Sequence, residues 1–385
     1  MKIFGIGKGK KSSEPVKKKI KGKGNSTLTR YSNNPIISPR EGYWWESRQT
    51  FNAGAILLED KVHLLYRAIG DDRISRIGYA ASKEGFNIEE RLDYPVYQHS
   101  VTSAEFAIYS YASGGSFGGC EDPRIVRVEN EDVLYMTYTA CDSGLRVGLS
   151  SIRMQDFLDK KWEWSHPCLI SPPGEVHKNW VIFPEKIKGK YAILHSLTPR
   201  ISITYLDSLD LKPGNYLSSY HDRGNGFGRE DFWDSLVRGV GAAPIKTKLG
   251  WLLFYHAIDL RESSKYKIGA LLLDIEDPTR VIRCSSTSVL EPATIYENSG
   301  FKPGIVYLSG AVVKDGELLL YYGASDSYVC VASCKLEDFL QVLLEEGRSV
   351  FIEMQAPPSS LQKKQRISRP RRGTPLSRKD KNKKK

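Results

Sequence analysis

Short runs of apolar residues alternate with polar and turn-forming residues along most of the chain. Such alternation, with Gly and Pro between the runs and few long stretches of helical spacing, is typical of β-strands joined by tight turns. One segment differs, because KLEDFLQVLLEEG places apolar residues at i, i+3 and i+4 and ends at Gly347. The pattern predicts an all-β fold, with a short helix after the last strands.

The strand pattern repeats five times. The segments KVHLLYRA, DVLYMTYTA, KYAILHSL, GWLLFYHA and GELLLYYGA each combine a turn, an apolar run and an aromatic ring followed by a small or polar residue. The aligned rings, separated by 72, 57, 60 and 67 residues, are Tyr66, Tyr138, His195, Tyr255 and Tyr322. Five such units predict a five-bladed β-propeller, because a single blade cannot bury both faces of its sheet. A β-sandwich with coincidental ring spacing is the alternative.

The residue after each aligned ring is a candidate for a shared site. In a propeller, equivalent positions of the blades converge near the central axis. These positions hold Arg67, Thr139, Ser196, His256 and Gly323. We therefore expect an arginine, a histidine and two hydroxyl groups to face one polar pocket that is built from distant parts of the chain.

The net charge of +11 over 385 residues is spread unevenly. Residues 1–30 carry net +9 and residues 358–385 net +11, which leaves 34 basic and 43 acidic side chains, net −9, in residues 31–357. A protein that neutralises DNA phosphates should carry its positive charge on the folded part. We therefore predict a folded domain at 31–345 between basic disordered tails at 1–30 and 346–385, and no specific nucleic-acid partner. Weak electrostatic contact of the tails with RNA or an anionic membrane surface remains open.

Targeting and metal-binding patterns do not stand out. No apolar run near the start suits a signal peptide and no 18-residue apolar stretch suits a membrane span, so we expect a cytoplasmic protein. The six cysteines form no CxxC pair. Cys330 and Cys334 share one face of the alternating strand VCVASC, where buried thiols are expected rather than metal ligands. We predict no metal and no organic cofactor.

The string GGCEDPRIVRV, residues 118–128, places Glu121, Asp122 and Arg124 around a proline. With its surroundings it resembles glycoside hydrolase family 130, the mannoside phosphorylases and related mannosidases, which are five-bladed propellers. The resemblance runs from about residue 34 to 339 in nine ordered blocks, which are NPIISP, FNAGAILL, LLYRAIGDD, GCEDPRI, FPEKIKGKYAILH, WDSLVRGVGAAPIKT, GWLLFYH, YKIGALLLDIEDP and YYGASD.

The resemblance implies a role for individual residues. Asp122 matches the family's proton donor, and cleavage of a glycosidic bond needs an acid at the leaving oxygen. In the family, the proton is thought to pass through a hydroxyl of the bound mannose. The predicted sugar-binding residues are Asn52, Arg67, Glu121, Arg124 and Asp326. The predicted phosphate-binding residues are Lys178, Asn179, Arg238, His256 and Tyr266.

The attacking group distinguishes two enzyme reactions. An inverting phosphorylase needs no base, because phosphate arrives as an anion and only has to be held, whereas an inverting hydrolase needs a carboxylate that activates water. The chain departs from the phosphorylase pattern at Ser196, in LHSLTP, where an arginine usually follows the histidine. The candidate bases for a hydrolase are Glu230, Asp231 and Asp234, in GREDFWDS.

We predict a glycosyltransferase-type β-mannoside phosphorylase. It carries out inverting phosphorolysis of β-mannosides to α-mannose 1-phosphate, or the reverse synthesis, with Asp122 as acid and inorganic phosphate as co-substrate. The alternatives are an inverting β-mannosidase that uses water and a non-catalytic sugar-binding propeller. A furanosidase-type propeller with acids at Asp71, Asp122 and Glu185 fits the EDPR and YYGASD strings poorly.

Overall fold

The computed structural model describes residues 28–100, 114–142, 144–217, 226–349 and 351. Most of the two predicted basic tails lies outside these residues. The described part of the chain consists mainly of β-strands with a few short helices, which confirms the predicted all-β class.

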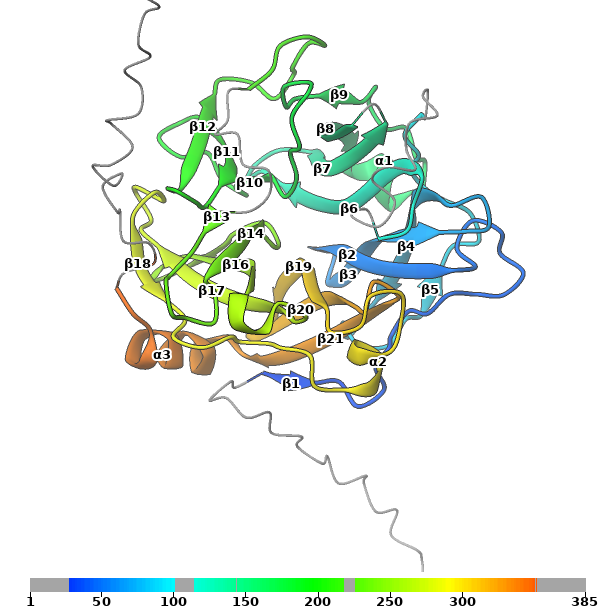
Figure 1. Ribbon diagram of the computed structural model, residues 1–385. Coiled ribbons are helices and arrows are strands. Elements are labelled where there is room, and N and C mark those ends of the chain that lie inside the picture. The colour runs from blue at the N-terminus through cyan, green and yellow to red at the C-terminus, as the bar shows by residue number, and fades with distance from the viewer. Residues whose placement is uncertain (1–27, 101–113, 143, 218–225, 350, 352–385) are drawn as a thin grey trace, which may run out of the picture. The chain divides into compact units, whose positions relative to one another are not determined.

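The described strands form four sheets, which contain five successive antiparallel meanders because a short parallel pairing of β4 with β6 joins the first two meanders into one sheet (Figure 1). The first contains β2 (Gln49–Leu58), β3 (Lys61–Ile69), β4 (Ile74–Ser82) and β5 (Glu90–Arg91). The second contains β6 (Gly118–Arg127), β7 (Val133–Asp142), β8 (Gly144–Arg153) and β9 (Cys168–Leu169). The third contains β10 (Val181–Ile182), β11 (Tyr191–Ser196) and β12 (Ser202–Leu206). The fourth contains β13 (Gly226–Phe227), β14 (Leu236–Val240), β15 (Ile245–Thr247), β16 (Gly250–Ile258), β17 (Tyr266–Leu273) and β18 (Val281–Cys284). The fifth contains β19 (Val306–Lys314), β20 (Glu317–Ala324), β21 (Tyr328–Lys335) and, from the start of the fold, β1 (Thr29–Arg30).

Helices are peripheral. They are α1 (Met154–Leu158), the 3₁₀ turn η2 (Leu260–Glu262), α2 (Ile295–Asn298) and α3 (Leu336–Glu346). The last of these is the helix that the apolar spacing predicts, and Gly347 follows it. Its apolar face buries Phe339, Leu340 and Leu343. Within the described residues, no helix is both long and apolar enough to span a bilayer.

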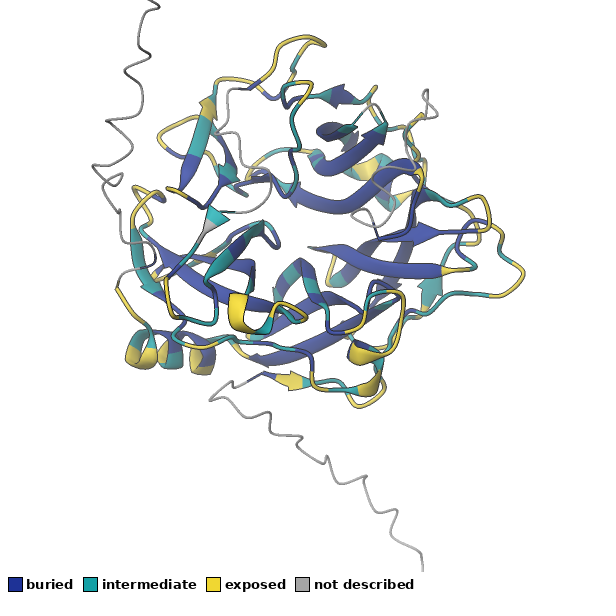
Figure 2. Ribbon diagram, in the orientation of Figure 1, coloured by how far each residue is buried: buried dark blue, intermediate teal, exposed yellow. Residues whose placement is uncertain are grey.

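One strand of each meander, called its inner strand below, lies at the middle of the described fold. Figure 1 shows β2, β6, β10, β14 and β19 around a common centre, and β2 contacts both β6 and β19. Most residues of β2, β6, β10 and β19 are buried, whereas three of the five residues of β14 have intermediate exposure, and exposed residues gather in the outer loops (Figure 2). Side chains on the inner strands are therefore withdrawn from bulk water.

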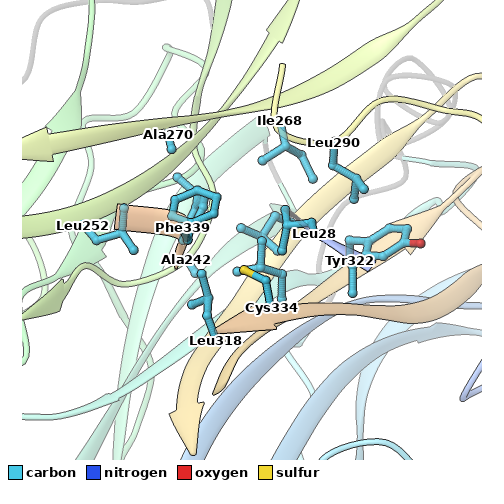
Figure 3. Close-up of a cluster of buried hydrophobic side chains, with 14 of the residues drawn as sticks. Leu28, Ala242, Leu252, Ile268, Ala270, Leu290, Leu318, Tyr322, Cys334 and Phe339 are labelled. Carbon is cyan, nitrogen blue, oxygen red and sulfur yellow. The ribbon is translucent and has the colours of Figure 1, made fainter. Parts of the chain in front are cut away.

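Apolar side chains fill the space between neighbouring meanders. Between the fourth and fifth, Leu252 and Ile268 meet Leu318 and Tyr322, and Phe339 of α3 covers them (Figure 3). Equivalent clusters join the first meander to the second, the second to the third and the third to the fourth. Each sheet is therefore covered by apolar groups of its neighbours along the chain.

A fifth cluster joins the two ends of the series. Tyr321 and Val331 of the fifth meander pack with Leu64 and Tyr66 of the first. The predicted buried thiols, Cys330 and Cys334, lie on the same strand β21, and both are buried.

The fold extends beyond its predicted bounds of 31–345. In β1, Thr29 pairs with Ser333 and Arg30 with Ala332 of β21, so these residues are part of a sheet and not of a tail. At the other end, the backbone of Arg348 forms an antiparallel β-bridge with Cys284, and Phe351 is buried.

The repeated tyrosine has the same structural role in three meanders. Its hydroxyl donates to a buried carboxylate, which an arginine also binds. The three sets are Tyr66–Glu46–Arg91, Tyr255–Asp234–Arg229 and Tyr322–Glu297–Arg30, with hydroxyl–carboxylate distances of 2.6, 2.7 and 2.8 Å. Buried charges are tolerated when they are paired and hydrogen-bonded, so each set anchors its sheet with a satisfied polar group.

A glycine on the next strand accompanies most of these rings. Gly78 lies opposite Tyr66, Gly148 opposite Tyr138 and Gly269 opposite Tyr255. A Cβ at any of the three would come within 2.4 Å of the ring, which is closer than atoms can approach. The glycines in IGYAAS, VGLSS and KIGALLLD therefore make room for the aromatic ring.

We predict that Arg30→Met lowers the free energy of unfolding by about 3–5 kcal/mol at pH 7, because it leaves the charge of Glu297 buried and unpaired. Arg30 Nε lies 2.7 Å from Glu297 Oε1. Burial raises the pKa of Glu297, but Arg30 and the backbone N–H groups of Ala293 and Thr294 outweigh burial and lower that pKa. A lowered pKa gives stability above the unfolded-state value of about 4.3, and this stability is lost as pH falls. The deficit of the variant should therefore shrink in urea unfolding repeated near pH 4.

The matched control is Arg153→Met, which removes an ion pair with Asp156 whose arginine side chain is 76% exposed. Exposed pairs contribute about 0–1 kcal/mol, so this variant should unfold close to the wild type. Equal effects of the two substitutions would contradict the structural role of Arg30.

Candidate active site

Four of the five inner strands, β2, β6, β14 and β19, carry a β-bulge. Register shifts fall between Phe51 and Gly54 in β2, Glu121 and Arg124 in β6, Val237 and Gly239 in β14, and Leu308 and Gly310 in β19. A bulge changes the direction of a side chain on the strand. Asn52 and Asp122 lie in two of these bulges with φ of 49° and 50°, a region that Asn and Asp tolerate. Asn179, just before β10, has φ of 64°.

Asp122, the predicted proton donor, is almost completely buried. Its Oδ1 accepts hydrogen bonds from Asn52 Nδ2 at 2.8 Å and Arg67 Nη1 at 3.4 Å. Burial raises the pKa of Asp122, but the positive charges of Arg67, Lys178 and Arg124 outweigh it and hold the pKa below its usual value. In the free protein Asp122 is therefore a carboxylate at neutral pH.

Glu121 is fully buried beside Asp122 and binds two cations. Its Oε1 accepts from Arg67 Nη2 at 3.2 Å, and its Oε2 accepts from Lys178 Nζ at 3.0 Å. Burial lowers the pKa of Lys178, but the charges of Glu121 and Asp122 outweigh it and raise the pKa. The structure thus brings predicted sugar-binding and phosphate-binding residues into one group of ion pairs.

Arg124 connects three meanders. Its Nε donates to the Gly241 carbonyl at 2.7 Å, Nη1 to the Asp122 carbonyl at 2.8 Å and Nη2 to Asn179 Oδ1 at 2.8 Å. Because these donors are used on protein groups, Arg124 holds the backbone of Asp122 and the side chain of Asn179 in place.

Four of the five predicted phosphate-binding residues form a second group. Asn179 Nδ2 donates to the Arg238 carbonyl at 3.0 Å, and Arg238 Nε donates to the Tyr266 hydroxyl at 3.0 Å. Asn179 Oδ1 accepts from the Tyr307 hydroxyl at 2.6 Å. The ring of His256 stacks on Tyr307, with ring centroids 3.9 Å apart. Asn179 and Arg124 link this group to Asp122.

Asp326 belongs to the loop between β20 and β21. Its carboxylate lies 3.2 Å from Lys302 Nζ, and Gln49 Nε2 donates to its carbonyl and to that of Gly114, both at 2.7 Å. Burial lowers the pKa of Arg67, but nearby carboxylates, Asp326 among them, outweigh burial and raise it. The carboxylate of Asp326 therefore acts on the same arginine as Asp122 does.

The sequence did not reveal every residue of the site. The repeat does not predict Tyr307, although Tyr307 pairs with Gly323, one of the five aligned positions, and that pairing is a usable signal. Lys302, Gln49 and Ser116, which accepts from Arg67 Nη2 at 3.1 Å, lie outside the aligned positions. No repeat pattern marks these three residues.

Several buried polar atoms near this centre have no hydrogen-bond partner among the described residues. They are Asn52 Oδ1, Thr139 Oγ1, His256 Nδ1, Ser309 Oγ and Ser325 Oγ. Buried polar atoms are nearly always paired in folded proteins, so a water, an ion or a bound molecule is expected to pair with such exceptions. A separate cavity of about 30 Å³ is lined in part by Lys178, Asn179, Ser196 and Arg238.

The candidate bases for a hydrolase do not enter this group. Asp234 is fully buried, and its oxygens are bound by the tyrosine and arginine of the fourth meander. Glu230 and Asp231 are exposed in the loop before β14. Ser196 Oγ donates to the Thr198 carbonyl at 2.6 Å, so this position supplies no charge.

Comparisons with known proteins agree on one family. Residues 11–345 match the profile of the glycoside hydrolase 130 family, described as β-1,4-mannooligosaccharide phosphorylase. The chain belongs to glycoside hydrolase family 130. This family-130 chain is 36% identical over 326 residues to a 1,2-β-oligomannan phosphorylase of Thermoanaerobacter sp. (strain X514), covering 81% of the chain and 98% of the relative. It is 33% identical over 325 residues to a β-1,2-mannobiose phosphorylase of the same organism, covering 80% and 98%.

A solved structure of the family shares the fold. The β-1,2-mannobiose phosphorylase of Listeria innocua in complex with β-1,2-mannobiose superposes with a TM-score of 0.63 at 25% identity, covering 82% of the family-130 chain and 99% of the other.

We predict that Gly323→Ala destabilises the protein by about 1–3 kcal/mol, because overpacking a filled site forces its neighbours to move. A Cβ at Gly323 would lie 2.0 Å from Asn52 Oδ1, the amide that binds Asp122. Urea unfolding measures the loss. The double variant with Asn52→Gly removes the clashing oxygen and should be more stable than the sum of the two single changes implies. Strict additivity would show that the two positions do not meet.

Proposed function

We propose that the protein is a β-mannoside phosphorylase whose five meanders are the blades of a five-bladed propeller. Apolar clusters join each meander to the next and the fifth to the first, as closure of a ring requires. The structural similarity to the Listeria enzyme and the sequence similarity to the two Thermoanaerobacter phosphorylases support the assignment.

One observation carries the proposed reaction. A buried carboxylate, Asp122, lies within one hydrogen-bonded group that also contains the cations Lys178 and Arg238. In the proposed step, an oxygen of hydrogen phosphate attacks the anomeric carbon of mannose, and the glycosidic C–O bond breaks. The leaving oxygen gains a proton that Asp122 supplies, and inversion at carbon gives α-mannose 1-phosphate.

The protonation of Asp122 depends on whether phosphate is bound. Asp122 is ionised in the free protein because Arg67, Lys178 and Arg124 surround it. A phosphate anion beside Lys178 offsets part of this positive charge, and a less positive surrounding raises the pKa of a carboxyl. We infer that phosphate binding raises the pKa of Asp122 and so brings a proton to the acid.

The phosphate site contains fewer guanidinium groups than the family pattern. Ser196 leaves one bidentate contact out, and Lys178 acts as a point charge. Arg238 keeps a fixed orientation, since Tyr266 accepts from its Nε. Phosphate is therefore held by two cations together with neutral donors of the surrounding group.

We propose β-1,2-linked mannosides as the first substrates to test. The two relatives with 36% and 33% identity are phosphorylases named for 1,2-linked substrates, whereas a β-1,4-mannooligosaccharide phosphorylase of Ruminococcus albus is 26% identical. A further solved structure, 25% identical with a TM-score of 0.65, comes from work on family members that hydrolyse β-1,2 mannosidic linkages. Release of free mannose is therefore measured alongside phosphorolysis.

We predict that purified protein converts β-1,2-mannobiose to α-mannose 1-phosphate only when phosphate is present. Phosphate at about 10 mM exceeds the usual ceiling of KM values, about 1 mM. Asp122→Asn should lower kcat by at least about 10²-fold, because an amide cannot supply the proton. Chromatography of the products with and without phosphate measures both effects.

The control is Asp132→Asn, since Asp132 has a side chain that is 91% exposed. It should retain the wild-type rate. Free mannose at equal rates with and without phosphate would identify a hydrolase. Mannoside binding without turnover, unchanged in Asp122→Asn, would identify a sugar-binding protein.

We also predict that phosphate binding is accompanied by proton uptake that depends on Asp122. Isothermal titration at pH 7 in two buffers of different ionisation enthalpy gives the number of protons taken up. Asp122→Asn should take up fewer protons than the wild type, because the amide does not titrate. Equal uptake by the two proteins would show that Asp122 does not respond to phosphate.

A further inference from the structure

His256 lies on β16 among the residues that are proposed to bind phosphate. Its backbone pairs with Gly239 of β14, and the residue is fully buried. Its Nε2 lies 2.9 Å from the carbonyl oxygen of Leu308 in the fifth meander. The ring is therefore fixed between two neighbouring sheets.

The carbonyl of Leu308 fixes the tautomer of His256. A carbonyl oxygen can only accept, so Nε2 must be the N–H donor, and in a neutral ring Nδ1 then presents a lone pair. Burial lowers the pKa of His256 to about 3, with Arg124 contributing in the same direction, so the ring is neutral at pH 7. Nδ1 is buried and has no partner among the described side chains and backbone groups.

The surroundings place this bare acceptor among the groups proposed to hold phosphate. His256 stacks on Tyr307, whose hydroxyl donates to Asn179 at 2.6 Å. Tyr266, which accepts from Arg238, has its ring centroid 5.9 Å from that of His256. The charged groups that act on the imidazole are Arg124, Arg238 and Asp122.

We propose that His256 Nδ1 accepts a hydrogen bond from the P–OH group of hydrogen phosphate, so that the site selects tetrahedral oxyanions that carry a proton. This inference rests on the proposed phosphorylase function and deepens it. Phosphate and arsenate both retain at least one hydroxyl at neutral pH, whereas sulfate, which has the same shape, has none. An unprotonated oxygen opposite Nδ1 would oppose two lone pairs in a buried place, and such unmet pairs are costly.

The proposed contact also orients the nucleophile. With the hydroxyl directed to His256, the unprotonated oxygens of phosphate are left for Lys178 and Arg238 and for the anomeric carbon. A neutral histidine thereby contributes direction to a site whose cations alone attract any anion equally.

The test compares sulfate and arsenate as competitors of phosphate in phosphorolysis of β-1,2-mannobiose by the full chain. We expect arsenate to compete with an apparent affinity within about 3-fold of that of phosphate, and sulfate to bind about 10- to 100-fold more weakly. Sulfate that competes as well as arsenate would overturn the proposal while leaving phosphorolysis established. Absence of phosphorolysis at any phosphate concentration would instead refute the proposed function.

His256→Gln is the informative variant. Its amide N–H can replace Nε2 as the donor to Leu308. Its Oε1 is bonded to Cδ, so no acceptor stands at the position that Nδ1 occupies in histidine. We expect KM for phosphate to rise about 10-fold or more and the preference over sulfate to fall to within about 3-fold, with a smaller change in KM for the mannoside. Circular dichroism and thermal melting check the fold, and the wild-type competition decides the question if the variant does not fold. A raised mannoside KM with an unchanged preference over sulfate would show that Nδ1 faces a sugar hydroxyl, which contradicts the proposal.

Discussion

The close approach of the inner strands at the centre of the fold is the constraint on which the rest of the structure depends. A Cβ at Gly54 would lie 2.4 Å from the Pro123 carbonyl, and one at Gly310 would lie 2.6 Å from the Ala53 carbonyl. Backbones this close leave no room for side chains between them. The bulges relieve the crowding, and the residues within them direct their polar groups to the gap that remains. Much of the site is therefore a consequence of how the sheets meet, and loops add Lys178, Asn179 and Asp326 to it.

Mutual pairing explains how so many ionised groups can lie close together. Five cations, Arg67, Arg124, Lys178, Arg238 and Lys302, share the region with the carboxylates of Glu121, Asp122 and Asp326. Each buried ion alone would carry a large desolvation cost, and the mutual pairing offsets that cost. The pairing also fixes the positions of the groups before any substrate arrives, so little reorganisation is needed at the reacting atoms.

Much of this arrangement could be predicted from the sequence because it repeats. The aligned rings identified the strand that pairs with the inner strand of each unit, and the next residue led to Arg67 and His256. The family resemblance supplied Asp122 and its neighbours. The direction of the pKa shift at Asp122 could not be predicted, since Lys178 comes from a different meander and its distance is set by folding. The sequence offers Asp234 as a candidate base for a related reason, because only the structure shows that Arg229 and Tyr255 bind its carboxylate.

Loop residues lay beyond sequence reasoning. Lys302 and Gln49 contact Asp326 from positions that have no counterpart in the other units, so no alignment of the repeats could find them.

The burial of single side chains could not be predicted either. Trp44 and Trp45 are adjacent in the sequence, yet Trp44 is 55% exposed and Trp45 is buried. Neighbouring residues of one type can therefore have unlike surroundings.

The pairing of β1 with β21 places the start of the fold in its last sheet. The sheet formed by β19, β20 and β21 gains its outer strand from residues that are synthesised some 300 positions earlier. During translation, the segment around Arg30 has no partner until the ribosome has released most of the chain. Contacts of such long sequence separation form slowly and hold the structure together once made. Completion of this sheet therefore requires that most of the chain has already been synthesised.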